Sequence, residues 1–171
     1  MDQFTNTIYL DNNATTRVAP EVLEAMMPFF NERYGNPSSI HRFGGMVRRV
    51  VETAREQVAA LLNASPDEIY FVSCGSEGDN MALQGFCNDK GTNGLIITST
   101  VEHPAVRNTS RALKKKGARL VELSVDGEGM FSLNSLREQP INPNTLASFM
   151  WANNETGVIF PIEEAVQVVK E

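Results

Sequence analysis

The chain has 171 residues, of which 42% are hydrophobic and 21% are charged, a balance typical of globular proteins rather than of disordered or fibrous ones. Its net charge of −6 disfavours binding to nucleic acids and to anionic membranes. No stretch approaches the roughly 20 apolar residues of a transmembrane helix, and the amino terminus lacks a signal-peptide pattern, so we expect a cytoplasmic protein without membrane partners.

The amino-terminal third of the chain predicts a short strand followed by two helices. The strand covers residues 8–10, and an amphipathic helix starts near Pro20, a residue suited to the first helical turn. A turn-rich stretch, residues 34–39, precedes a longer helix. Apolar residues at helical spacing predict the buried faces of the two helices: Val22, Met26 and Phe29 in the first, and Val47, Val50, Ala54, Val58 and Leu61 in the second.

From residue 69 onward, strand-like runs alternate with helical patterns. We expect strands at residues 69–72, 95–98, 119–123 and 146–151, with helices after the first, second and fourth. Such alternation requires crossover connections, so the predicted fold is α/β, a predominantly parallel sheet with helices on both faces. Residues 162–171 are helical in pattern to the last residue, without a glycine stop, so we expect the sheet to be incomplete in this chain.

A polar turn follows the first strand of this alternating region. Residues 73–80 read SCGSEGDN and lead into a helix, where free backbone N–H groups favour an anion such as a phosphate. Gly75 would let the backbone approach that anion, and Ser76 would add a hydroxyl donor. The alternative is an ordinary helix cap made by the serine and acidic side chains. Spacing leaves both open, but the turn matches neither the dinucleotide-binding nor the P-loop pattern.

Two more polar loops follow later strands. Residues 100–104 (TVEHP) contain His103, whose imidazole could stack on a planar ligand or transfer a proton. Residues 151–157 (WANNETG) carry two carboxamides and a carboxylate, which could orient a ligand oxygen or simply form a turn. Because the carboxyl ends of parallel strands share one edge of a sheet, we expect the three loops to meet there.

The remaining candidate residues favour structural roles. Cys74 and Cys87 give neither a metal-ligand spacing nor a disulfide framework, so no metal site is expected. Cys87 is predicted to lie in the core, and a nucleophilic role for Cys74 is disfavoured because no histidine adjoins it. His41 is expected to pack within its loop. The cluster Lys114–Lys116 is expected to end a helix before Gly117.

Taken together, five ordered motifs resemble the amino-terminal half of the NifS-type cysteine desulfurases, which are class-V-aminotransferase-like enzymes. The resemblance implies a partial large domain of the aspartate-aminotransferase-like fold, fold type I of the pyridoxal-phosphate enzymes. On that basis residues 1–35 would form an amino-terminal arm and helix, and residues 36–171 an incomplete cofactor-binding domain. The motifs are YLDNNATT at residues 9–16, GNPSSIH at 35–41, SCGSE at 73–77, EHPAV at 102–106 and MWANNETG at 150–157.

The resemblance also implies an activity. Such enzymes use pyridoxal 5′-phosphate to remove sulfur from L-cysteine, giving L-alanine and an enzyme-bound persulfide for iron–sulfur cluster assembly, and they are usually homodimers. By the same resemblance, Gly75 and Ser76 bind the cofactor phosphate. His103 stacks on the ring and assists proton transfer, and Asn154 bonds the ring hydroxyl. A loop near the substrate entrance contains Asn12, Ala14 and Thr15.

The sequence departs from the family pattern in two small ways and one large one. Ser76 replaces a threonine but keeps the hydroxyl, and Gly78 replaces a serine, so we expect a looser start of the helix. The aspartate that pairs with the ring nitrogen, the Schiff-base lysine and the catalytic cysteine of the family all lie beyond residue 171. We therefore expect the chain alone to be inactive and to be completed by a carboxyl-terminal half.

Two other functions remain open at this stage. The chain could be a non-catalytic fragment that docks onto a desulfurase or an iron–sulfur scaffold protein. It could also belong to a related pyridoxal-phosphate lyase, such as one that acts on selenocysteine.

Overall fold

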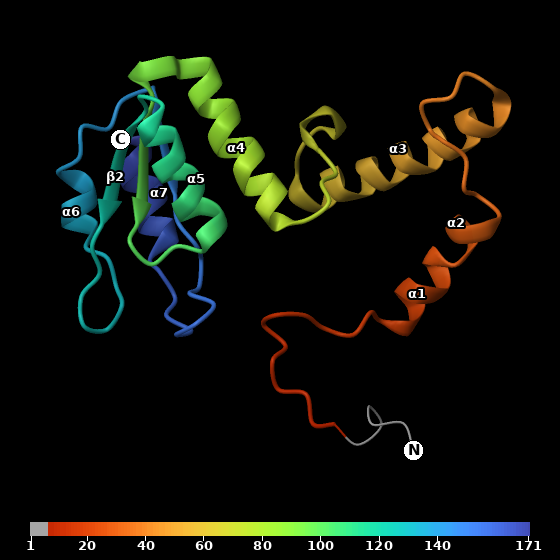
Figure 1. Cartoon of the computed structure of the whole chain (residues 1–171), viewed down its shortest axis with the longest axis horizontal. Helices are drawn as coiled ribbons and strands as arrows, with labels where there is room; N and C mark the ends of the chain where they lie inside the picture. Colours follow the sequence, from red (N-terminus) through yellow and green to blue (C-terminus); the bar gives the residue numbers. More distant parts are fainter. Residues whose placement is uncertain (1–6) are drawn as a thin grey trace. The chain divides into compact units, whose positions relative to one another are not determined.

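The computed structural model describes residues 7–171, which form two compact units (Figure 1). The first unit runs to Phe71, and the second spans Val72–Glu171. The predicted division between an arm of residues 1–35 and a larger domain of residues 36–171 stays a prediction.

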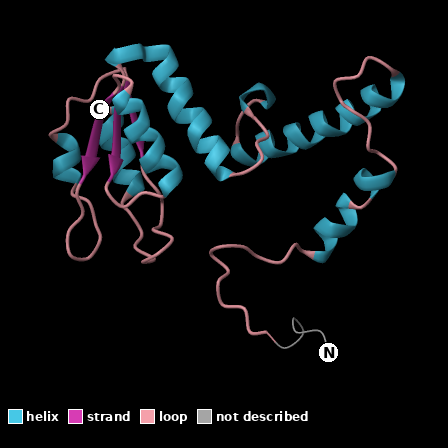
Figure 2. Cartoon of the chain, in the orientation of Figure 1, coloured by secondary structure: helices cyan, strands magenta, loops and turns pink. Residues whose placement is uncertain are grey.

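The second unit contains a sheet of three parallel strands, which confirms the predicted fold class. The strand order is β2-β1-β3, so β1 is the central strand and all five of its residues are buried (Figure 2). Both pairings with β1 are parallel, as crossover connections through helices require. The strands are β1 (Leu95–Ser99), β2 (Arg119–Leu123) and β3 (Thr145–Ser148).

Helices cover both faces of this sheet. Because successive strand residues point to opposite faces, Ile96 packs under α4 and α5, whereas Leu95 and Ile97 pack under α6 and α7. Cys87 lies in the first of these clusters, as predicted. The helices are α4 (Gly75–Lys90), α5 (Pro104–Lys115), α6 (Leu133–Arg137) and α7 (Ile162–Lys170), with a 3₁₀ turn η2 (Gly91–Asn93) after α4.

The sequence did not reveal α6, which has only five residues and starts where the Ser132 hydroxyl accepts a hydrogen bond from the Ser135 N–H. The lysine cluster does end α5, with Lys116 at the cap and Gly117 at a φ of 107°. That φ lies in the region that glycine tolerates best.

The first unit contains the two predicted helical regions. The helix starting at Pro20 is interrupted by Pro28, which cannot donate a backbone hydrogen bond, so it divides into two short helices. His41 caps the long helix, because its Nδ1 accepts a hydrogen bond of 3.2 Å from the Gly44 N–H. The elements are α1 (Pro20–Met26), α2 (Pro28–Asn31), α3 (Arg42–Leu62) and the 3₁₀ turn η1 (Pro66–Glu68).

Two predicted strands are wrong, and the predicted burial of the helix faces holds only in part. Residues 8–10 and 69–72 form no strand, although both runs are apolar. The Arg55 guanidinium donates to the Ile69 carbonyl and lies 5.0 Å from the centroid of the Phe71 ring, so the segment around these residues packs against α3. The predicted apolar faces of the α1–α2 region and of α3 are only partly buried. Val47 is buried as predicted, but four of the predicted side chains remain exposed: Val22 at 50%, Met26 at 43%, Phe29 at 38% and Leu61 at 84%.

Alanine substitutions at two adjacent glycines of α3 should have opposite effects on stability. An alanine Cβ at Gly44 would lie 2.6 Å from the Asn36 carbonyl oxygen, whereas one at Gly45 would meet nothing within 4 Å. Gly44→Ala should therefore destabilise the chain by about 1–3 kcal/mol, and Gly45→Ala should stabilise it by about 0.5–1 kcal/mol through the helix propensity of alanine. Urea unfolding followed by circular dichroism measures both, and equal effects would contradict the close packing of Gly44.

Candidate functional site

The three polar loops meet at the carboxyl edge of the sheet. The Thr109 hydroxyl of α5 donates to the Asn80 Oδ1 of α4 at 2.8 Å. Asn80 lies five residues after Gly75, where α4 begins, and Thr109 lies five residues after Pro104, where α5 begins. The two helices therefore run side by side in the same direction and start at the same end of the unit. The sequence predicted this convergence, although the first loop does not follow a strand of the sheet.

The loops after β1 and β3 are joined directly to each other. Met150 N–H donates to the Glu102 Oε1 at 2.9 Å, and the Asn153 Nδ2 donates to the Val101 carbonyl at 3.1 Å. The first of these bonds also explains why β3 stops at Ser148, short of the predicted end at residue 151, because the Met150 N–H has a side-chain acceptor instead of a strand partner.

The turn before α4 leaves its first backbone donors available. Cys74 occupies the capping position and makes no side-chain cap bond, and a side chain at Gly75 would meet nothing within 4 Å. The Glu77 carboxylate turns back to accept from the Ser73 N–H at 2.5 Å and from the Ser73 hydroxyl at 2.7 Å. Capping by Glu77 thus stabilises the chain before the helix and leaves the approach to Gly75 and Ser76 open.

The same turn favours negative charge. The pKa of the exposed Cys74 thiol is lowered, chiefly by the nearby Glu77 N–H, then by the Ser73 hydroxyl and the Ser76 N–H, against the opposing effects of burial and of the Glu77 charge. The N–H groups that stabilise a thiolate would equally stabilise a phosphate oxygen. The residues present therefore fit a phosphate group, which is the cofactor portion predicted to bind here.

The structure places His103 at the start of α5, where its side chain is exposed. Its Nδ1 accepts a hydrogen bond of 3.1 Å from the Ala105 N–H. An accepting Nδ1 carries no proton, so the imidazole is held as the tautomer with the proton on Nε2. His103 thus presents Nε2 as the ring nitrogen available to a ligand.

Asn154 is exposed on the loop after β3, and its Nδ2 donates to the Glu155 Oε1 at 3.2 Å. The preceding Asn153 is only 7% exposed, and its Oδ1 accepts from the N–H groups of Glu155 and Thr156, both at 2.9 Å. The two asparagines therefore differ: Asn153 shapes the turn, and Asn154 is presented on it. Sequence reasoning left turn formation and ligand contact open for this pair. The structure assigns turn formation to Asn153, and ligand contact by Asn154 stays a prediction.

Glu102 is a site residue that sequence reasoning missed. It is 5% exposed, and its Oε1 also accepts from the Ser99 hydroxyl at 3.2 Å. Burial raises the pKa of this carboxyl, with hydrogen bonds from Met150 and Ser99 acting in the opposite direction. An acidic residue after a strand is usually solvated, so the sequence pointed to a role for Glu102 only through its position beside His103.

The predicted entrance residues Asn12, Ala14 and Thr15 lie in the first unit and are exposed. The Ala14 N–H donates to the Asp11 carbonyl at 3.1 Å, which forms a turn. Their proximity to the residues at the sheet edge stays a prediction.

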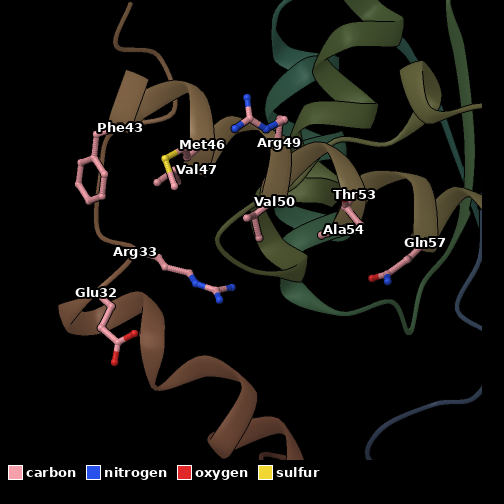
Figure 3. Close-up of a pocket in the computed structure, with 10 residues that line it drawn as sticks. All are labelled: Glu32, Arg33, Phe43, Met46, Val47, Arg49, Val50, Thr53, Ala54 and Gln57. Carbon is pink, nitrogen blue, oxygen red and sulfur yellow. The ribbon is translucent and has the colours of Figure 1, made fainter. Parts of the chain in front are cut away.

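A cavity of about 550 Å³ lies in the first unit and contains none of the predicted site residues (Figure 3). Arg33, which follows α2, extends across it toward α3, and Glu32 lines the same side of the cavity as Arg33. The α3 side of this cavity is lined by Phe43, Met46, Val47, Arg49, Val50, Thr53, Ala54 and Gln57.

Among residues 7–171, no helix has both the length and the apolar character needed to cross a membrane. Within the same residues, no group of three or more His, Cys, Asp or Glu side chains is arranged to hold a metal ion.

Known proteins match the chain along nearly all of its length. The family model for class-V aminotransferases matches residues 8–171. A cysteine desulfurase of Trichormus azollae is 52% identical over 164 residues, covering 96% of this chain and 41% of the relative. The cysteine desulfurase IscS of Clostridium botulinum (strain Kyoto / Type A2) is 45% identical over 166 residues, again covering 96% of this chain and 42% of the relative.

Solved structures agree with these matches. A NifS-like protein superimposes with a TM-score of 0.88 at 41% identity, covering 95% of this chain and 45% of that structure. A structure of SspA in complex with cysteine gives a TM-score of 0.86 at 35% identity, covering 96% of this chain and 48% of that structure. The chain spans 41% of the length of the first curated relatives that it matches. Since the family model covers both compact units, the chain belongs to the aminotransferase class-V family and is similar to its cysteine desulfurases.

Proposed function

We propose that this chain provides the cofactor-phosphate turn and two ring-contacting residues of a pyridoxal-phosphate-dependent cysteine desulfurase. The observation that carries the proposal is the anion-favouring turn at Cys74–Ser76, which lies at the same sheet edge as His103 and Asn154. The cysteine desulfurase names of the relatives, and the solved SspA complex with cysteine, support L-cysteine as the substrate.

Each residue has a distinct role in this proposal. The N–H groups at the start of α4 and the Ser76 hydroxyl would hold the phosphate, and Gly75 would allow its close approach. His103 would stack beside the ring and move a proton at Nε2, the nitrogen left free by the Ala105 N–H. Asn154 would bond the ring hydroxyl. When bound, the cofactor supplies an electron-withdrawing ring that weakens bonds at the substrate carbon.

The complete reaction would convert L-cysteine to L-alanine and transfer the sulfur to a cysteine thiol as a persulfide, which serves iron–sulfur cluster assembly. We assign the cofactor-anchoring lysine, the partner of the ring nitrogen and the persulfide-forming cysteine to a complementary carboxyl-terminal half. We also propose a homodimer and an iron–sulfur scaffold protein as further partners. By itself the chain should bind the cofactor without turning over cysteine.

Ligand binding to the 171-residue chain tests this proposal. Pyridoxamine 5′-phosphate is a suitable probe because it lacks the aldehyde that would react with surface lysines. Isothermal titration calorimetry should show it binding about tenfold or more tightly than inorganic phosphate, since the ring adds stacking and a hydrogen bond. Pyridoxamine without phosphate should bind more weakly than pyridoxamine 5′-phosphate. Equal affinity for pyridoxamine 5′-phosphate and inorganic phosphate would contradict the proposed ring contacts.

A further inference from the structure

Glu102 joins the two loops that carry the proposed ring-contacting residues. Its Oε1 accepts from the Ser99 hydroxyl, three residues earlier in the chain, and from the Met150 N–H, 48 residues later. Because the side chain is only 5% exposed, water has little access to hydrogen-bond the carboxyl in place of either donor. A buried carboxyl at this position therefore connects the end of β1 to the loop after β3.

A second connection uses a side chain of the loop after β3. Asn153, on the loop after β3, donates to the Val101 carbonyl on the loop after β1, across 52 residues of sequence. His103 directly follows Glu102, and Asn154 directly follows Asn153. Each proposed ring contact is therefore next in sequence to a buried residue that is bonded to the other loop.

We propose that Glu102 is a positioning residue whose carboxyl holds the loop bearing Asn154 in register with His103, so that both can contact one cofactor ring. This inference rests on the proposed function. None of the hydrogen bonds described joins Glu102 to His103 or Asn154. Glu102 therefore acts through the Met150 backbone.

The chemistry of the side chain explains why an acceptor is needed here. An apolar residue of similar size would leave the Met150 N–H and the Ser99 hydroxyl without an acceptor, and buried unpaired donors are costly. A glutamine keeps the carbonyl oxygen that would accept both bonds. The phosphate turn before α4 has its own hydrogen bonds between Ser73 and Glu77, which do not involve Glu102.

The test compares two variants with two ligands. Glu102→Leu should weaken binding of pyridoxamine 5′-phosphate by about tenfold and change binding of inorganic phosphate by less than about twofold. Glu102→Gln should restore pyridoxamine 5′-phosphate affinity to within about threefold of the unmodified chain. A general loss of folding would weaken the binding of both ligands together. The ratio of the two affinities therefore reports the positioning of the ring-contacting residues.

Other outcomes separate this inference from the proposed function. If the unmodified chain binds both ligands equally, the proposed function fails and this inference fails with it. If the unmodified chain prefers pyridoxamine 5′-phosphate and Glu102→Leu keeps that preference, only the role of Glu102 is overturned. A Glu102→Gln variant as weak as Glu102→Leu would also overturn it.

A variant that removes a single donor covers the case in which Glu102→Leu does not fold. Ser99→Ala removes the hydroxyl, together with the 3.3 Å bond that it accepts from the Val101 N–H, but leaves the Glu102 bond to Met150. It should reduce the preference for pyridoxamine 5′-phosphate over inorganic phosphate by about threefold. Amide hydrogen exchange at Met150 should quicken in the same variant. An unchanged preference with unchanged exchange would overturn the inference.

Discussion

Replacing Gly75 with aspartate should abolish tight binding of phosphate-bearing ligands and leave the chain at least as stable as before. A side chain at this position would meet nothing within 4 Å, so the substitution creates no clash. A carboxylate in the first turn of α4 interacts favourably with the helix dipole, by about 0.3–1 kcal/mol. The same carboxylate would repel a phosphate at the N–H groups of the turn. At a separation of about 4 Å this repulsion is large enough to raise the dissociation constant about 100-fold.

Gly75→Asn is the matched control, because asparagine has the shape of aspartate without its charge. Titration calorimetry with pyridoxamine 5′-phosphate should show a much smaller loss for Asn than for Asp, and urea unfolding should show both variants folded. Since the two side chains have nearly equal volume, equal losses would mean that bulk blocks the site. Unchanged binding in Gly75→Asp would place the phosphate elsewhere and refute the proposed turn.

Replacing Phe131 with alanine should cost about 3–5 kcal/mol of unfolding free energy, the range for a large aromatic residue removed from a packed core. Phe131 is 2% exposed, and its ring centroid lies 4.6 Å from that of Phe149 and 5.3 Å from that of Phe160. Because Phe149 directly precedes Met150, the cavity would also loosen the backbone bonded to Glu102. Ligand binding should weaken together with stability.

Urea unfolding followed by circular dichroism measures the cost of Phe131→Ala. Ile159→Ala is the control, since Ile159 is adjacent to Phe160 in sequence but is 65% exposed. Truncation of such a side chain should change stability by less than about 0.5 kcal/mol. Similar values for the two variants would show that the three aromatic rings do not form a close-packed core.

Local sequence patterns were sufficient for most helices and strands of the second unit. Short apolar runs of strand type identified β1 and β2, and Pro104 marked the start of α5. Alternation of strands and helices then implied a parallel sheet, because only a crossover can join parallel neighbours. The strand order β2-β1-β3 agrees with that inference. The apolar runs and the proline at the start of a helix are local features, which a sequence displays directly.

Apolar pattern alone did not determine burial. Residues 69–72 have the composition of a strand, yet Tyr70 and Phe71 remain 67% and 52% exposed. Val22 and Met26 form a helical stripe that nothing fully covers among the described residues. A periodic pattern indicates which face of an element is apolar, but a strand exists only where a partner supplies its hydrogen bonds, and a face is buried only where another element covers it.

The sequence alone identified the family motifs and the residues proposed to contact the cofactor, since these follow local order along the chain. The tertiary structure alone separated Asn153 from Asn154 and revealed Glu102, because the bonds to Val101 and Met150 cross 52 and 48 residues. A polar side chain becomes a buried connection only when distant backbone groups fold against it. Composition cannot show this, because the same glutamate in water would be an ordinary surface charge.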